Sequence, residues 1–124
     1  MDTHSFLWYA TDNDRITREA RRILLDPTCD LLLSVVSVWE MAIKISLEKL
    51  RVTPSLEHLI RIATHQQGIS LLEIRAKHAL QVADLPFHHR DPFDRLLAAQ
   101  AIVEDLPLLS ADRIFDRYPL RRIW

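Results

Sequence analysis

The sequence contains a single glycine, Gly68, in 124 residues. A phosphate-binding loop of the Walker type and a dinucleotide-binding fingerprint each need several glycines in one short segment, so both motifs are excluded. The single cysteine, Cys29, excludes a disulfide within the chain and leads us to expect a cytoplasmic protein. No apolar run approaches the roughly 20 residues that span a bilayer. The start at residues 1–4 also lacks the basic and apolar regions of a signal peptide.

Charge is abundant but nearly balanced, with 16 basic and 17 acidic residues and a net charge of -1. A protein that binds nucleic acid by charge alone usually carries a basic excess, so the composition argues against that class. A nuclease whose bound cations supply positive charge is still compatible with this balance. The length predicts one domain, and the hydrophobic fraction of 48% is enough for one buried core.

Predicted strands and helices alternate along the chain, which indicates an α/β fold with a parallel sheet. The strands are expected at residues 31–34, 69–74, 106–110 and 120–124. The helices are expected at residues 17–25, from Ser37 onward, from Pro54 to a stop at Gly68, and at 76–85, 91–104 and 112–118.

Four acidic residues stand at the end of a predicted strand or in the first turn of the helix that follows. In a parallel sheet these places meet in the crevice at the carboxyl ends of the strands. Clustered carboxylates repel one another unless a cation lies among them, and hard cations such as Mg²⁺ or Mn²⁺ prefer oxygen ligands. The sequence therefore predicts metal-dependent phosphodiester chemistry at four residues: Asp2, Glu40, Asp94 and Asp112.

Each acid taken alone also has a structural explanation, because an acid at a helix N-terminus contributes about 0.3–1 kcal/mol. Ser37 and Glu40 match a capping box. Asp91 is predicted to cap the helix that follows it, and Asp112 fits a cap as well as it fits a ligand. Asp2 has no predicted helix to cap nearby. The joint placement of the four acids is what favours a site.

The other chemically active residues give weaker signals. The six histidines show no paired spacing typical of a zinc site. His88, His89 and Arg90 fall in a segment that we interpret as an exposed loop, although it could touch phosphate.

Four stretches together resemble the PIN-domain ribonucleases, specifically the VapC-type toxins of bacterial toxin–antitoxin pairs. They are Asp2-Thr3-His4 with Trp8 after it, SVVSVWEMAIK at 34–44, HRDPFDRLLAAQA at 89–101 and LPLLSADRIF at 106–115. The resemblance covers nearly the whole chain, and its second and third stretches are the specific ones.

The resemblance implies a single PIN domain over residues 1–124, built as a three-layer α/β/α sandwich with a central parallel sheet. It implies Mg²⁺- or Mn²⁺-dependent cleavage of RNA, a protein antitoxin as partner, and a homodimer. Thr3 and Ser110 match small hydroxyl positions beside the acids, and Asp91 matches a further acid that caps its helix or holds a metal-bound water. The family's catalytic and metal-binding quartet corresponds to Asp2, Glu40, Asp94 and Asp112.

One departure from the family concerns the first strand, which several apolar residues ahead of the first acid usually form. Here that strand is expected to be shortened before Asp2. This departure and the near-neutral charge leave open a rival hypothesis, a binding module whose acidic pocket is decayed or holds only a structural ion. A nuclease directed at DNA would use the same site, and competition between substrates would distinguish it because only RNA offers a 2′-hydroxyl.

Overall fold

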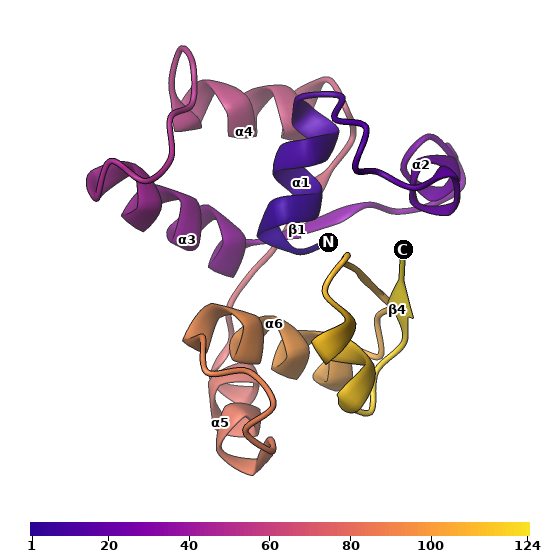
Figure 1. The fold of residues 1–124 in the computed structure, drawn as a ribbon, viewed down its shortest axis with the longest axis vertical. Coiled ribbons are helices and arrows are strands. Elements are labelled where there is room, and N and C mark those ends of the chain that lie inside the picture. The colour runs from indigo at the N-terminus through magenta and orange to yellow at the C-terminus, as the bar shows by residue number, and fades with distance from the viewer.

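The computed structural model describes all residues, 1–124, as helices and short strands (Figure 1). The helices are α1 (Thr3–Ala10), α2 (Arg18–Leu24), α3 (Val35–Ser46), α4 (Leu56–His65), α5 (Ala76–Asp84), α6 (Pro92–Val103) and the 3-10 helix η1 (Arg113–Arg117). The strands are β1 (Leu32–Ser34), β2 (Ser70–Leu72), β3 (Leu108–Leu109) and β4 (Arg122–Ile123). The predicted alternation is confirmed, although the strands are shorter than expected. None of the helices combines the length and the apolar character needed to cross a membrane.

The strands form two parallel pairs, β1 with β2 and β3 with β4, rather than one continuous sheet. The first two residues of the chain lie between the pairs. The Met1 nitrogen donates to the carbonyl of Leu32 at 2.9 Å, and the Asp2 N–H donates to the carbonyl of Leu109 at 3.0 Å. Met1 and Asp2 thus stand in the place of a central strand and connect the two halves of the sheet.

Helices cover both faces of the strands, which confirms the three-layer arrangement. Neighbouring residues of a strand point to opposite faces. On β3, Leu108 packs against residues of α6 and η1, whereas Leu109 packs against α2. On β1, Leu33 packs in a cluster with side chains of α1, α3 and α4. In Figure 1, α5 and α6 accordingly lie on one side of the strands and α1, α3 and α4 on the other.

The predicted start of α3 is wrong by two residues. The helix begins at Val35, and the Ser34 hydroxyl caps it by accepting from the Val36 N–H at 3.0 Å. Ser37 therefore lies inside the helix, where its buried hydroxyl has no hydrogen-bond partner, and the Ser37–Glu40 capping box is not formed. The reason is that β1 runs directly into α3 without a loop, so the last residue of the strand serves as the cap.

The expectation that Asp2 has no helix to cap is also wrong. Asp2 is the N-cap of α1, and its Oδ1 accepts from the Ser5 N–H at 2.7 Å. The sequence hides α1 because its large apolar residues run consecutively from Phe6 instead of recurring at helical spacing. The helix forms because Phe6, which is fully buried, anchors it in the cluster around Leu33.

We expect Leu33→Ala to lower the free energy of unfolding by about 2–5 kcal/mol, because Leu33 is fully buried between layers and its truncation leaves a cavity. Urea denaturation followed by circular dichroism measures the change. Leu80→Ala is the matched control, since Leu80 on α5 is 72% exposed and should change stability by no more than about 0.5 kcal/mol. Equal losses in the two variants would contradict this assignment of the core.

Candidate active site

Asp2 is a buried carboxylate with both oxygens engaged. Its Oδ1 accepts from the N–H of Ser5 in the first turn of α1, and its Oδ2 accepts from the hydroxyl of Ser110, just after β3. The Ser110 hydroxyl also accepts from the Asp112 N–H at 3.0 Å. Ser110 therefore fixes the distance between two of the predicted acids, which come from opposite ends of the sequence.

Glu40 is buried to 6% exposure on α3 and is held from two sides. Its Oε2 accepts from the Thr3 hydroxyl at 2.5 Å. Its Oε1 lies 2.6 Å from the Lys44 ammonium, one helical turn further along. The structure thus places Thr3 and Ser110, the two predicted hydroxyl positions, in direct contact with the acids Glu40 and Asp2.

Asp94 lies half-buried in the first turn of α6, where Asp91 is the cap as predicted. The Asp91 Oδ1 accepts from the N–H groups of Phe93 and Asp94 at 2.8 and 3.4 Å. The pKa of the Asp94 carboxyl is raised to about 7, first because burial desolvates it. Four neighbouring carboxylates raise this pKa further, and they are Asp91, Glu40, Asp2 and Asp112.

Asp112 contacts His89, a residue that the sequence analysis did not assign to the site. Its Oδ1 caps η1 by accepting from the Ile114 N–H, and its Oδ2 lies 3.1 Å from His89 Nε2. His89 is 4% exposed and its ring stacks on that of Tyr118 at 5.5 Å between centroids. The interpretation of His89 as part of an exposed loop is therefore wrong, whereas Arg90 beside it is exposed.

His89 begins one of the stretches that resemble the PIN-domain ribonucleases, but its neighbours in the sequence do not indicate which residues it contacts. Its partners Asp112 and Tyr118 lie 23 and 29 residues further along the chain. Only the folding of η1 against the segment ahead of α6 brings them together. The imidazole orients the Asp112 carboxylate in a way that local patterns could not predict.

The acids influence one another electrostatically, yet their side chains do not form a coordination shell around a common point. No group of three histidine, cysteine, aspartate or glutamate side chains stands close enough to hold a metal ion. The chemistry of the donors nevertheless fits a hard divalent cation, because it consists of carboxylate oxygens without a thiol. Burial first, and then the neighbouring carboxylates, raise the pKa of Asp94, and a cation among these acids would favour its charged form. The residues able to supply ligands are Asp2, Glu40, Asp94 and Asp112.

The sequence matches the model of the PIN domain family over residues 1–120, and the chain belongs to this family. No curated protein matches the sequence. Among solved structures, the chain is similar to the crystal structure of VapBC2 from Rickettsia felis bound to a DNA fragment from their promoter. The TM-score is 0.71 at 16% sequence identity, and the match covers 98% of this chain and 93% of that chain. This likeness shows a shared fold.

The raised pKa of Asp94 should make stability fall with rising pH. The folded protein keeps this proton up to a pH of about 7, whereas the unfolded chain loses it near 3.8. Between these values the folded state binds more protons, so the free energy of unfolding decreases as the pH rises. Asp94→Asn carries no such proton. With chelator present at pH 8, the free energy of unfolding of Asp94→Asn should exceed that of the parent by about 1–2 kcal/mol, a value that takes the partial solvent exposure of Asp94 into account. At pH 4 the two proteins should be equally stable.

Urea denaturation at the two pH values measures this difference. The matched control is Asp84→Asn at an exposed position of α5, which should follow the parent at both pH values. If the stability of Asp94→Asn depended on pH as that of the parent does, a raised pKa of Asp94 would not be the cause of the pH dependence.

Proposed function

We propose that this PIN-domain protein is a Mg²⁺- or Mn²⁺-dependent endoribonuclease and the toxin of a toxin–antitoxin pair. The observation that carries the proposal is the convergence of the acids on two hydroxyl groups: Ser110 contacts both Asp2 and Asp112, and Thr3, next to Asp2, donates to Glu40. The pKa of Asp94, raised to about 7 by burial and by four other carboxylates, supports it, because perturbed pKa values gather at functional sites. Membership of the PIN domain family supports nuclease activity, and the resemblance of the sequence stretches around the acids supports the VapC type.

The four acids Asp2, Glu40, Asp94 and Asp112 would hold one or two divalent cations. When bound, a cation supplies a lowered pKa for a coordinated water and positive charge for the scissile phosphate. The chain itself supplies orientation. Donation from hydroxyl groups fixes Asp2 and Glu40, and the His89 imidazole fixes Asp112.

Asp94 is the candidate for moving a proton. No side chain donates to its carboxylate, in contrast to the other three acids. An Asp94 carboxylate oxygen without a side-chain donor has a lone pair available to orient an attacking water or to accept its proton. Both oxygens of Glu40 already have partners, Thr3 and Lys44, so Glu40 is the orienting acid rather than the base in this scheme.

The partner that we propose is a protein antitoxin, on the precedent of the VapBC2 complex. An exposed tryptophan backed by a phenylalanine offers it a surface. The ring of Trp39, 53% exposed, meets that of the partly buried Phe93 edge-on at 5.0 Å, and these residues directly precede Glu40 and Asp94. Exposed apolar patches of this kind mark interaction sites. We also propose a homodimer, which light scattering on the free protein tests.

We expect the purified protein to cleave members of a panel of structured RNAs in Mg²⁺ or Mn²⁺ and not in chelator. Asp94→Asn should cleave more slowly by a factor above about 100, because changes even to the partners of metal ligands cost 10–100-fold. Gel analysis of end-labelled RNA measures the rates. Asp84→Asn is the control and should cleave like the parent.

Other outcomes would redirect the proposal. Cleavage of DNA in competition with RNA would identify a DNA-directed nuclease. No cleavage with any metal, by a protein shown to be folded, would support the binding-module hypothesis.

Metal binding should also be visible without turnover. Saturating Mg²⁺ is expected to raise the Tm of the parent by about 5 °C, because a cation bound only to the folded state stabilises it. Asp94→Asn and Glu40→Gln should gain less than half of this shift, and Asp84→Asn should gain all of it. Differential scanning fluorimetry measures the shifts. Equal gains in all four proteins would place the cation elsewhere.

A further inference from the structure

Tyr118 follows η1 directly, and its hydroxyl contacts His89 at two points. The Tyr118 oxygen accepts from the His89 backbone N–H at 3.0 Å and lies 3.2 Å from the Nδ1 atom of the His89 ring. Both residues are 4% exposed, and their ring planes are nearly parallel, 3° apart. One buried hydroxyl therefore holds the backbone and the side chain of His89 together.

The contacts of this hydroxyl determine which nitrogen of His89 carries the proton. A backbone N–H can only donate, so the Tyr118 oxygen accepts there and keeps its own hydrogen for another partner. That partner is Nδ1, the other group within hydrogen-bond distance. A neutral imidazole that accepts at Nδ1 carries its proton on Nε2, and this atom lies 3.1 Å from the Asp112 Oδ2.

The opposite neutral form of the ring fits these surroundings poorly. With the proton on Nδ1, the hydrogen of the Tyr118 hydroxyl would have no acceptor in the interior, and a buried polar group without a partner costs about 1–3 kcal/mol. The bare Nε2 would also turn its lone pair toward a carboxylate oxygen of Asp112. The geometry thus selects one direction for the chain of hydrogen bonds, from Tyr118 to His89 and from His89 to Asp112.

Asp112 depends on this donor because its own side chain is open to solvent. The side chain is 40% exposed, whereas that of His89 beside it is 4% exposed. Its Oδ1 accepts from the Ile114 N–H at 2.8 Å, and a single bond at one oxygen leaves the carboxylate able to turn. The second bond, from His89 to Oδ2, fixes the orientation. Carboxylates that bind a metal are commonly held by hydrogen bonds of this kind.

The position of the Tyr118 hydroxyl is set by the core. Tyr118 belongs to the same buried cluster as Phe115, Leu85 and Ala98. The ring of His89 also lies against Phe115, with 4.4 Å between centroids. The core therefore places the hydroxyl, and the hydroxyl places the imidazole.

We propose that Tyr118 is a positioning residue of the candidate active site, whose hydroxyl holds the His89 imidazole with its Nε2–H directed at Asp112. Tyr118 acts through His89 and keeps the Asp112 carboxylate in one orientation. The consequence for catalysis rests on the proposed function, in which Asp112 is a metal ligand. The chain of hydrogen bonds itself is present without a metal and can be tested without one.

The first test identifies the protonated ring nitrogen of His89 in the metal-free protein. Long-range proton–nitrogen NMR spectra at pH 8, where an ordinary imidazole is neutral, distinguish the two nitrogens. We expect the proton on Nε2 and a bare Nδ1. A proton on Nδ1 would overturn the proposal.

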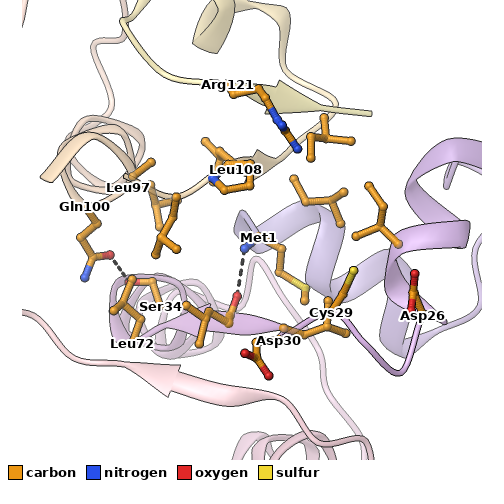
Figure 2. Close-up of a pocket in the computed structure, with 18 of the residues that line it drawn as sticks. Met1, Asp26, Cys29, Asp30, Ser34, Leu72, Leu97, Gln100, Leu108 and Arg121 are labelled. Atoms are coloured by element: carbon orange, nitrogen blue, oxygen red, sulfur yellow. Dashed lines mark hydrogen bonds between the residues drawn. The ribbon is translucent and has the colours of Figure 1, made fainter. Parts of the chain in front are cut away.

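The second test removes the hydroxyl alone. Tyr118→Phe keeps the ring, and the Nε2–H of His89 should exchange with solvent at least about tenfold faster because the imidazole is no longer held. Gln100→Met is the control for lost stability, since it removes a buried hydrogen bond between Ser34 and Gln100 in another part of the fold (Figure 2). Unchanged exchange in Tyr118→Phe, or equal acceleration in Gln100→Met, would overturn the proposal.

The third test measures Mg²⁺ affinity by calorimetry. Tyr118→Phe should weaken binding by a factor of about ten, the loss typical of a group that orients a metal ligand. Tyr9→Phe, which removes a hydroxyl on α1, should bind like the parent. His89→Phe keeps a ring without a donor, and adding Tyr118→Phe to it should cause no further loss because the two residues act in series. A further tenfold loss in the double variant would overturn the proposal.

These measurements separate the inference from the proposed function. A parent that binds no Mg²⁺ would defeat the proposed function, while the NMR spectra still decide whether Tyr118 holds His89. Mg²⁺ binding by a protein with the His89 proton on Nδ1 would leave the proposed function intact and overturn the role of Tyr118.

Discussion

Two hydrogen bonds join the two halves of the sheet, one from the Met1 nitrogen to the Leu32 carbonyl and one from the Asp2 N–H to the Leu109 carbonyl. The strands on either side are two or three residues long and pair only within their own half. The same two residues also start α1 and deliver the Asp2 carboxylate to the edge where the other acids converge. Sheet continuity, the first helix and the candidate active site therefore depend on one short segment.

The carboxylates around that edge are tolerated because most of them have a dedicated donor. Ser110 serves Asp2, Thr3 and Lys44 serve Glu40, and His89 serves Asp112; the donors come from four different segments of the chain. Asp94 has no such donor, and its pKa is raised by burial and by the neighbouring carboxylates. Side-chain donors thus hold Asp2, Glu40 and Asp112 in place, whereas none holds Asp94.

The sequence predicted the features that depend on local chemistry. The Asp91 cap, the proline start of α6 and the alternation of strands and helices all follow from residues within a few positions of one another. The sequence did not predict the features that depend on contacts between residues far apart in the chain. The helix α1 exists because Phe6 reaches the core around Leu33, and the buried state of His89 depends on Tyr118. The placement of the acids as a metal site is still a prediction, since what the structure shows is their mutual electrostatic influence.

The double role of Asp2 links the site to the fold. Its Oδ1 accepts from the first turn of α1 and its Oδ2 accepts from Ser110, and each oxygen keeps a second lone pair for a ligand. The ordered start of α1 therefore holds the carboxylate in the position where it meets a ligand. A ligand bound at Asp2 would in turn stabilise the start of α1, and a partner that holds α1 would raise the affinity of the site by the same factor.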